Sequence, residues 1–281
     1  MRLVLHTAPS VPLEADCICP DRLLGKSEKE VAELLVFHGN QKAQLGEFFH
    51  VQGEVTDGEV TVEGDLSKVK LLGCGMTCGR LRIIGDVGAH LGAGMSGGEI
   101  IVEGSASDWV GREMAGGRIT IRGDAGHMVG SAVRGAAIGM TGGEIFIHGS
   151  AKNEVGNGMR RGLIAIAGGS GDFTGVNLKA GTVVVLGQMG MRPGAGMVRG
   201  TIITTQPIEL LPTFNYDTTY RPPIVRTILL YLRKQGFFID DAYIGGQYQR
   251  WSGDSIELNK GEILVYADAQ LSGKRFGGNF R

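Results

Sequence analysis

The sequence has few cysteines, almost no excess of either charge and no long hydrophobic run. Its net charge is -1, which argues against strong electrostatic attraction to nucleic acid or to an anionic membrane surface. It has no stretch of ~18 apolar residues, and the N-terminus lacks the basic segment and apolar run of a secretory signal. We therefore expect a cytoplasmic protein with neither nucleic acid nor a membrane as its partner.

Motifs for catalysis and for metal binding are also missing. The four cysteines form the pairs Cys17/Cys19 and Cys74/Cys78, whose spacing suits neither a common zinc site nor a useful disulfide. The six histidines include no His-x-x-x-His pair, and the chain has neither a G-x-S-x-G turn nor a phosphate-binding loop. The sequence therefore predicts no catalytic residue, no metal site and no cofactor bound by this chain alone.

Glycine, in contrast, is abundant and periodic. The chain has 48 glycines among 281 residues, well above the usual ~7%. The phrase "GMSGGEIIVEG" returns in altered form in successive units, and the step is 19 residues except for one of 21 and one of 26. The last glycines of the units are Gly64, Gly85, Gly104, Gly123, Gly149, Gly168 and Gly187.

Each unit contains the pattern Gly-x-apolar-x-apolar-x-Gly, as in Gly98 to Gly104. This alternation between glycines predicts a short strand with a tight turn at each end. Strand units that repeat near every 20 residues predict a solenoid, in which parallel strands stack and equivalent side chains form columns. Three columns are expected to fill the interior: Val60, Leu81, Ile100, Ile119, Ile145, Ile164, Val183 and Ile202; Val62, Ile83, Val102, Ile121, Ile147, Ile166, Val185 and Thr204; and Met76, Met95, Met114, Met140, Met159, Leu178 and Met197.

The outward positions of the strands change character along the chain. The column of Glu59, Arg80, Glu99, Arg118 and Glu144 alternates in charge, which suits a solvated face with compensating ions. In later units the same face becomes apolar and therefore needs a cover. Two covers are possible, a helix predicted in the stretch Pro223 to Phe238 that stops at Gly236, or a partner protein.

Three segments follow from these patterns. Residues 1–53 form an N-terminal cap, with a strand at Leu3 to Leu5 and a helix that begins at the capping box of Ser27 and Glu30, before "VAELLVF". Residues 54–206 form the repeat domain, and residues 207–281 form a C-terminal tail, with a helix and a late strand at Gly261 to Ala267, that packs on the solenoid.

One interruption and one charged cluster are candidate functional features. Seven additional residues between Gly130 and Gly143 must loop outward from one turn, and solenoid insertions often lie on functional faces. Basic residues gather on the edge of the next turns and in that loop. These cations are either solvated surface or a site for an anionic carrier or an acidic partner. The candidate contact residues are Arg134, Arg160, Arg161, Lys179, Arg192 and Arg199.

A column of short polar residues offers a different possibility. Asp65 and Asp86 occupy equivalent places and could approach the carboxyl separation of a glycosidase. The column continues through Ser105, Asp124 and Ser150, which is typical of turn positions whose side chains bond nearby backbone. We therefore predict a structural role for these aspartates.

The ordered combination of motifs resembles a known family. The leader "FHGNQKAQLGEFFHVQG" from Phe37 to Gly53, the repeat phase and the insertion "VGSAVRGAAIGMTGG" are similar to the C subunit of formylmethanofuran dehydrogenase and of the bacterial formyltransferase/hydrolase complex. The resemblance implies a mainly β fold, a right-handed parallel β-helix of about eight 19-residue turns with small α/β caps at both ends.

The same resemblance implies a scaffold role without an active site of its own. The implied partners are an amidohydrolase-like A subunit, which carries the metal, a B subunit, and a formyltransferase D subunit. Such a bacterial complex transfers a formyl group from tetrahydromethanopterin to a methanofuran-type carrier and hydrolyses it to formate, in the one-carbon metabolism of formaldehyde oxidation. The glutamate-rich tail of that carrier is anionic, which bears on the basic residues.

Several alternatives remain open at this stage. The helix around Ile224 to Leu232 favours the bacterial complex over the C subunit of a redox formylmethanofuran dehydrogenase. The glycine repeat is also similar to the C-terminal domain of the large chain of glutamate synthase. A stand-alone carbohydrate enzyme would be expected to have an acidic cleft, and a hexapeptide-repeat acyltransferase would need turns of 18 residues, so both are disfavoured.

Overall fold

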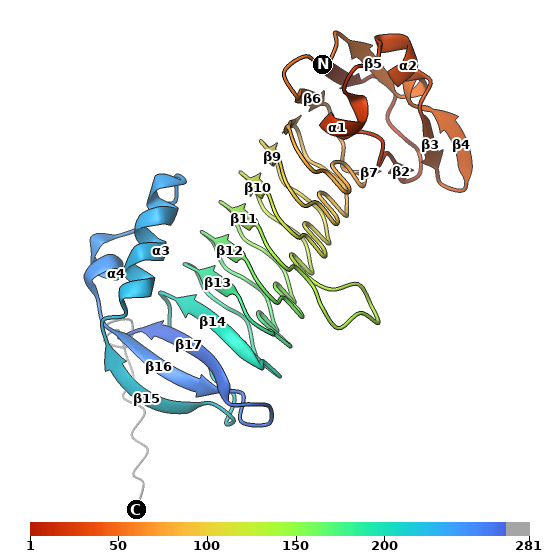
Figure 1. Ribbon diagram of the computed structural model, residues 1–281. Coiled ribbons are helices and arrows are strands. Elements are labelled where there is room, and N and C mark those ends of the chain that lie inside the picture. The colour runs from red at the N-terminus through yellow and green to blue at the C-terminus, as the bar shows by residue number, and fades with distance from the viewer. Residues whose placement is uncertain (268–281) are drawn as a thin grey trace, which may run out of the picture.

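The computed structural model describes residues 1–267 and is mainly β, with a large and mostly parallel sheet, as predicted (Figure 1). Thirteen strands form this sheet, and a second sheet has four. Within residues 1–267, no helix is long and apolar enough to cross a membrane. The repeat contributes the strands β6 (Glu59–Glu63), β8 (Arg80–Ile84), β9 (Glu99–Val102), β10 (Arg118–Ile121), β11 (Glu144–Ile147), β12 (Leu163–Ile166), β13 (Thr182–Val185) and β14 (Arg199–Thr204).

The register of these strands follows the sequence repeat. Neighbouring strands pair in parallel, and Ile100, Ile119 and Ile145 lie opposite one another as predicted for a column. The step of 26 residues leaves this register intact, because the additional residues project as a loop after β10 (Figure 1). A second ladder of parallel bridges links Leu66, Val87, Ala106, Ala125 and Ala151. Each unit therefore contacts the next at two places.

The three predicted interior columns are confirmed by burial. Every member of the two apolar strand columns is fully buried, and so is the methionine-rich column. Methionine fills irregular space because it is unbranched and flexible, and this stack lies beside the glycines that precede each strand. The methionines are therefore core filler.

The column of short polar residues holds the turns together. The Asp86 carboxylate accepts a hydrogen bond from the Ser105 backbone N–H at 2.7 Å, and the Asp124 carboxylate accepts one from the Ser150 N–H at 2.7 Å. Between them, the Ser105 hydroxyl accepts from the Asp124 N–H at 3.1 Å. Each of these side chains satisfies a backbone donor of the following unit, which confirms the structural role predicted for the column.

The N-terminal residues cover one end of the stack. β1 (Arg2–Leu5) extends the large sheet beside β6 and pairs with β5 (Phe49–Gln52) on its other side. The second sheet has the order β4–β3–β2–β7, and the remaining elements are short helical segments. Their bounds are β2 (Leu13–Glu14), β3 (Leu35–His38), β4 (Gln41–Gln44), β7 (Val69–Lys70), α1 (Pro20–Leu23), α2 (Glu28–Ala32) and the 3-10 turn η1 (Leu45–Glu47).

The predicted capping box is present, but the helix that follows it is shorter than expected. The Ser27 hydroxyl accepts from the Glu30 N–H, and the Glu30 carboxylate accepts from the Ser27 N–H at 2.8 Å. The helix ends at Ala32, and the apolar run that was predicted to continue it enters β3 instead. β3 pairs with β4 in an antiparallel hairpin, and the alternation of a strand buries Val36 while Leu35 stays exposed.

The C-terminal residues cover the other end. β17 (Lys260–Tyr266) pairs in parallel with β14, and β16 (Tyr248–Gly253) and β15 (Asn215–Tyr220) continue the sheet antiparallel. The late strand and the helix predicted after residue 207 are confirmed as β17 and α3 (Pro223–Lys234), with a short α4 (Asp241–Gly245) after them. Residues 268–281 of the predicted tail lie outside the described part of the chain.

Helix α3 covers the apolar outer face of the later strands (Figure 1). Its buried residues Val225, Leu229 and Leu232 belong to one hydrophobic cluster with the sheet. Self-coverage is therefore the arrangement observed, and it removes from water the apolar face that the sequence left unexplained. The strand residues in this cluster are Phe146, Ala165, Val184, Ile203 and Leu264.

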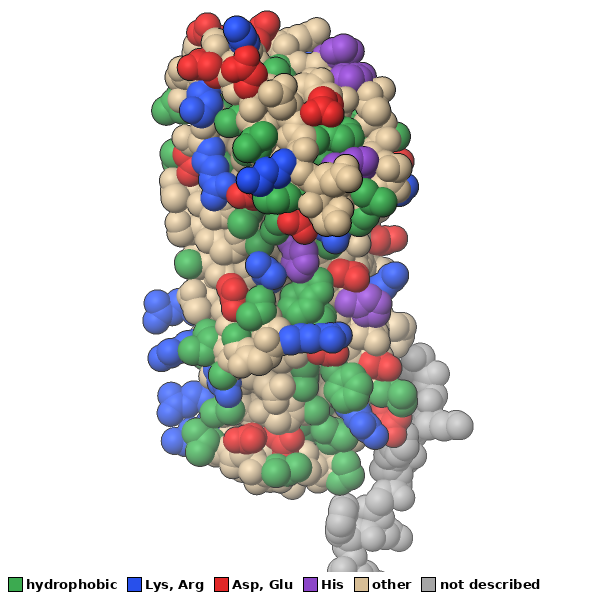
Figure 2. Space-filling model, turned by 90° about the vertical axis from the view of Figure 1, so that its right-hand side faces the viewer, with side chains coloured by type: hydrophobic (Ala, Val, Ile, Leu, Met, Phe, Trp, Pro, Cys, Tyr) green, Lys and Arg blue, Asp and Glu red, His purple; other side chains and the backbone are tan. Residues whose placement is uncertain are grey.

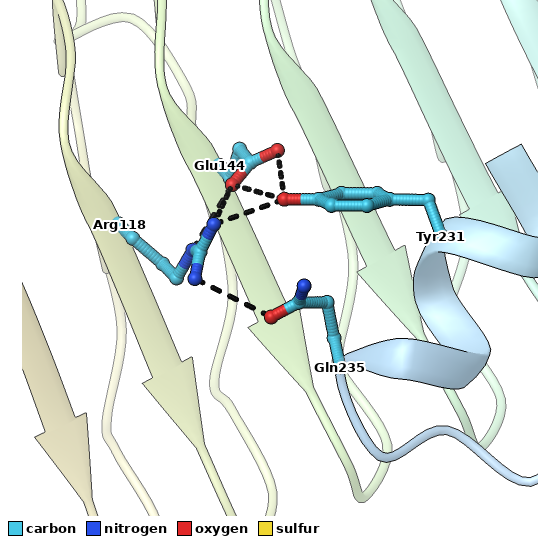
Figure 3. Close-up of polar contacts among 4 residues, drawn as sticks. All are labelled: Arg118, Glu144, Tyr231 and Gln235. Carbon is cyan, nitrogen blue, oxygen red and sulfur yellow. Dashed lines mark hydrogen bonds and ion pairs between the residues drawn. The ribbon is translucent and has the colours of Figure 1, made fainter.

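A polar network fixes the end of α3 to the sheet (Figure 3). Arg118 pairs with Glu144 at 2.8 Å, and the Tyr231 hydroxyl donates to the same carboxylate at 2.7 Å. Arg118 also donates to the Gln235 side-chain oxygen at 3.3 Å. Burial and the hydrogen bond to Glu144 raise the pKa of Tyr231, so its hydroxyl stays protonated and donating.

Replacing Tyr231 by phenylalanine tests this network. We expect the variant to lose about 2 kcal/mol of unfolding free energy, because the Tyr231 hydroxyl donates to Glu144 and accepts from Arg118 at 2.9 Å, and both hydrogen bonds are lost while Glu144 keeps Arg118 as its partner. Tyr216→Phe is the matched control, since Tyr216 is 52% exposed and its hydroxyl is hydrogen-bonded to the nearby Thr219. Urea titrations compare the two, and equal losses would show that the network adds nothing to stability.

Candidate functional site: a basic groove

Four of the six predicted cations line one groove. Arg160, Arg161, Lys179 and Arg199 surround a cavity of about 730 Å³ at the edge where each unit enters its strand. Thr141, from the unit before Arg160, also lines the groove. Leu258, from the connection between β16 and β17, lines it on the side of the C-terminal cap. Figure 2 shows Lys and Arg side chains projecting one above another from one edge of the lower half of the molecule.

The basic character begins at a defined unit. At the places equivalent to Arg160 and Lys179, the earlier units have small residues, Ser96, Ala115 and Thr141. The chain thus keeps one edge of the solenoid neutral over several units and then lines it with cations. Because the cations are confined to consecutive units, a local function explains them better than a general requirement for a charged surface.

The backbone changes where the cations begin. In the earlier units, Gly97, Gly116 and Gly142 hold the places that Arg161, Ala180 and Arg199 hold later, and a Cβ at those glycines would overlap the preceding unit's backbone. The glycine that follows has φ between +79° and +87° in the earlier units and between +98° and +111° in the later ones. The backbone at this edge therefore differs between the neutral units and the cationic ones. The glycines are Gly79, Gly98, Gly117 and Gly143, then Gly162, Gly181 and Gly200.

The groove cations have no counterion in the described chain. Other arginines on the strands pair with acids, as Arg80 does with Glu99 and Arg82 with Glu103, both at 2.9 Å. Within residues 1–267, no side-chain hydrogen bond or ion pair joins any of the four groove cations to another residue, and no acidic residue lines the groove. Like charges brought close without compensation repel, so the arrangement favours an anionic ligand or partner.

The other two predicted contact residues lie elsewhere. Arg134 is exposed in the inserted loop, and Arg192 stacks over the Phe173 ring at 5.7 Å. Neither lines the groove. The sequence pattern also missed Leu258, which reaches the groove from outside the repeat and has no periodic signal that would place it there.

Metal-binding side chains and cysteine thiols are two further sources of possible chemistry in the described residues. No group of three or more His, Cys, Asp or Glu residues in residues 1–267 could hold a metal ion. Burial raises the pKa of the Cys17 thiol to about 11 and, together with a hydrogen bond to Asp21, that of Cys19 to about 12. Both thiols therefore remain protonated at neutral pH and are poor nucleophiles.

Comparisons with known proteins agree on one family. Residues 99–215 match the GXGXG motif family. A segment of 82 residues, 29% of the chain, is 46% identical to the C subunit of the molybdenum-containing formylmethanofuran dehydrogenase 1 of Methanothermobacter thermautotrophicus, over 20% of that protein. A segment of 87 residues, 30% of the chain, is 42% identical to the C subunit of the tungsten-containing dehydrogenase 2 of the same organism, over 32% of its length. The chain thus matches less than a third of the length of these curated relatives.

A solved structure matches over nearly the whole chain. It is the crystal structure of the formyltransferase/hydrolase complex (FhcABCD) from Methylorubrum extorquens in complex with methylofuran. The matched chain is 36% identical with a TM-score of 0.89, and the match covers 95% of this protein and 100% of that chain. The protein belongs to the GXGXG-motif family of C subunits, found in formylmethanofuran dehydrogenases and in the formyltransferase/hydrolase complex.

Proposed function

We propose that this chain is a non-catalytic scaffold subunit of a cytoplasmic formyltransferase/hydrolase complex. The observation that carries the proposal is the match along the whole of one chain of such a complex. In this role its partners are an amidohydrolase-like A subunit, which holds the metal, a B subunit, and a formyltransferase D subunit. Together they would move a formyl group from tetrahydromethanopterin to a methanofuran-type carrier and release formate.

We further infer that residues 54–206 wind as a right-handed parallel β-helix between caps at residues 1–53 and 207–281. Support comes from the ladder of parallel strands, which continues from β6 to β14, and from a second set of parallel bridges that links most of the units. A rod of this kind has a rigid, repetitive surface on which other proteins can be placed at fixed distances. A scaffold needs such rigidity more than it needs reactive side chains.

Within this proposal the basic groove binds the anionic tail of the carrier. Stacked strands are spaced by ~4.8 Å, so Arg160, Lys179 and Arg199 present cations at short, regular intervals along the axis. Arginine can bind a carboxylate through two parallel hydrogen bonds, and the absence of acids among the lining residues removes a competing partner. Arg134 and Arg192 would add contacts only from outside the groove. An acidic segment of a partner protein is the other occupant this chemistry allows.

Affinity purification from the native host tests the scaffold role. We expect amidohydrolase and formyltransferase chains to co-elute with this protein in fixed ratio. Co-elution with a molybdenum- or tungsten-containing protein would support the redox dehydrogenase instead. A domain of glutamate synthase type would elute as part of a much larger chain. A lone monomer with hydrolytic turnover of its own would contradict the scaffold role.

The same preparation tests the groove. We expect the double variant Arg160→Glu, Arg161→Glu to retain at least tenfold less carrier than the unaltered complex, and the unaltered complex to lose carrier as salt is raised. Lys152→Glu is the control, because Lys152 is exposed and does not line the groove. If partner chains are lost while carrier binding per complex is unchanged, the groove binds an acidic partner. If neither changes, it is solvated surface.

A further inference from the structure

A second cavity lies at the C-terminal end, where the beginning of α3 meets the end of α4. It has a volume of about 330 Å³, and an adjoining cavity of about 460 Å³ shares Arg221, Gly245 and Gly246 with it. The first cavity is lined by two arginines, Arg221 and Arg226, and by apolar groups. It is formed entirely by the C-terminal cap and is separate from the basic groove.

The floor of this cavity is apolar. Ile244 and Tyr248 line it and are 8% and 1% exposed. The Tyr248 hydroxyl donates to the Tyr243 carbonyl at 2.9 Å, so its donor is already used. Ile244 and Tyr248 therefore form an almost fully packed apolar wall, and Pro223, which is exposed, adds an accessible apolar ring beside the two arginines.

The two arginines have no acidic partner. The nearby acids are engaged elsewhere: Asp241 pairs with Arg233 at 2.7 Å, Glu262 pairs with Arg250 at 2.8 Å, and Asp240 caps α4 through the Ala242 N–H. No side-chain hydrogen bond or ion pair joins Arg221 or Arg226 to any residue of the described chain. Two uncompensated guanidinium groups at one cavity favour an anion.

Gly245 keeps the cavity open. A Cβ added there would meet no heavy atom within 4 Å, and the φ of this residue does not lie in the left-handed region. Neither packing nor backbone conformation therefore requires glycine at this position. A larger side chain would occupy space beside both cavities, which is consistent with a place kept free for a ligand.

We propose that this cavity binds a carboxylate carried on a small apolar group. The carboxylate lies between Arg221 and Arg226, and the apolar group packs against Pro223 and Ile244. Guanidinium groups also bind phosphate, but a bare phosphate would make no contact with the apolar lining. The ligand class therefore combines one anionic group with a small apolar body, such as a phenyl ring.

Binding of benzoate, benzamide and inorganic phosphate to the purified full-length protein, followed by saturation-transfer NMR, tests this proposal. We expect benzoate to bind with a dissociation constant of about 1 mM, and benzamide and phosphate to bind at least tenfold more weakly. Tight phosphate binding with no benzoate binding would overturn the proposal. Equal binding of benzoate and benzamide would also overturn it, because the arginines would then play no part.

Substitutions at the cavity test whether benzoate binds there. Arg221→Gln and Arg226→Gln should each weaken benzoate binding about tenfold, and Gly245→Leu should abolish it by filling the space. Lys234→Gln, which removes an exposed cation at the other end of α3, should leave it unchanged. Circular dichroism of each variant verifies that the protein is folded. Unchanged benzoate binding in the folded arginine variants would place the site elsewhere and contradict the proposal.

Discussion

Replacing Gly117 by alanine is expected to lower the free energy of unfolding by about 2–5 kcal/mol, although only one methyl group is added. Gly117 has φ of +84°, and a Cβ there would lie 2.7 Å from the Gly98 carbonyl oxygen of the preceding unit. The left-handed conformation and the overlap with rigid backbone both oppose the substitution. Relief would require two paired strands to separate, which weakens the ladder between β9 and β10.

Gly94→Ala is the matched control for this prediction. Gly94 also has a left-handed φ, +65°, but no heavy atom lies within 4 Å of a Cβ added there. The equivalent residue of the next unit is Glu113, with φ of +54°, so the position accepts a side chain. We expect a loss of about 1 kcal/mol in urea titrations. Equal losses for the two variants would show that backbone overlap between units is unimportant.

The constraint that each unit places on the backbone of the next explains which parts of the fold could be predicted from the sequence. The columns were predictable because one glycine pattern constrains every unit in the same way, and burial of Met95 or Ile100 then follows from period alone. The length of α2 was not predictable, because the apolar residues Leu35 and Val36 fit a helix and a strand equally well. Pairing with β4 selects the strand.

The candidate site was predictable only in part, for the same reason. Arg160 and Lys179 occupy one column, so their proximity follows from the repeat. Leu258 and the cavity of Arg221 and Arg226 depend on antiparallel pairing of β15, β16 and β17, which occurs once and has no period. The larger φ of Gly162 could not be predicted from the residue pattern either, because glycine occupies the equivalent position in every unit.

The second large effect is expected at the interface of α3. Leu229→Asp should lower the free energy of unfolding by about 3–5 kcal/mol or detach the helix, because Leu229 is fully buried against the sheet and aspartate cannot be solvated there. Leu230→Asp is the control one residue away, since Leu230 is 36% exposed and does not belong to the hydrophobic cluster. We expect the control to change stability by less than about 1 kcal/mol.

Hydrogen exchange separates local detachment of α3 from general unfolding. If only the helix detaches, amides of residues 223–234 should exchange faster in Leu229→Asp, while amides of β9 and β10 keep their protection. Detachment would uncover Ala165, Val184 and Ile203, an apolar face that promotes association between molecules. The variant should then self-associate at micromolar concentration, and a monomer with unchanged α3 exchange would contradict the cover role of this helix. The groove cations lie in the turns that lead into β12 and β13 and at the start of β14, the strands that carry this face, so loss of the cover should also reduce carrier retention, whereas Leu230→Asp should not.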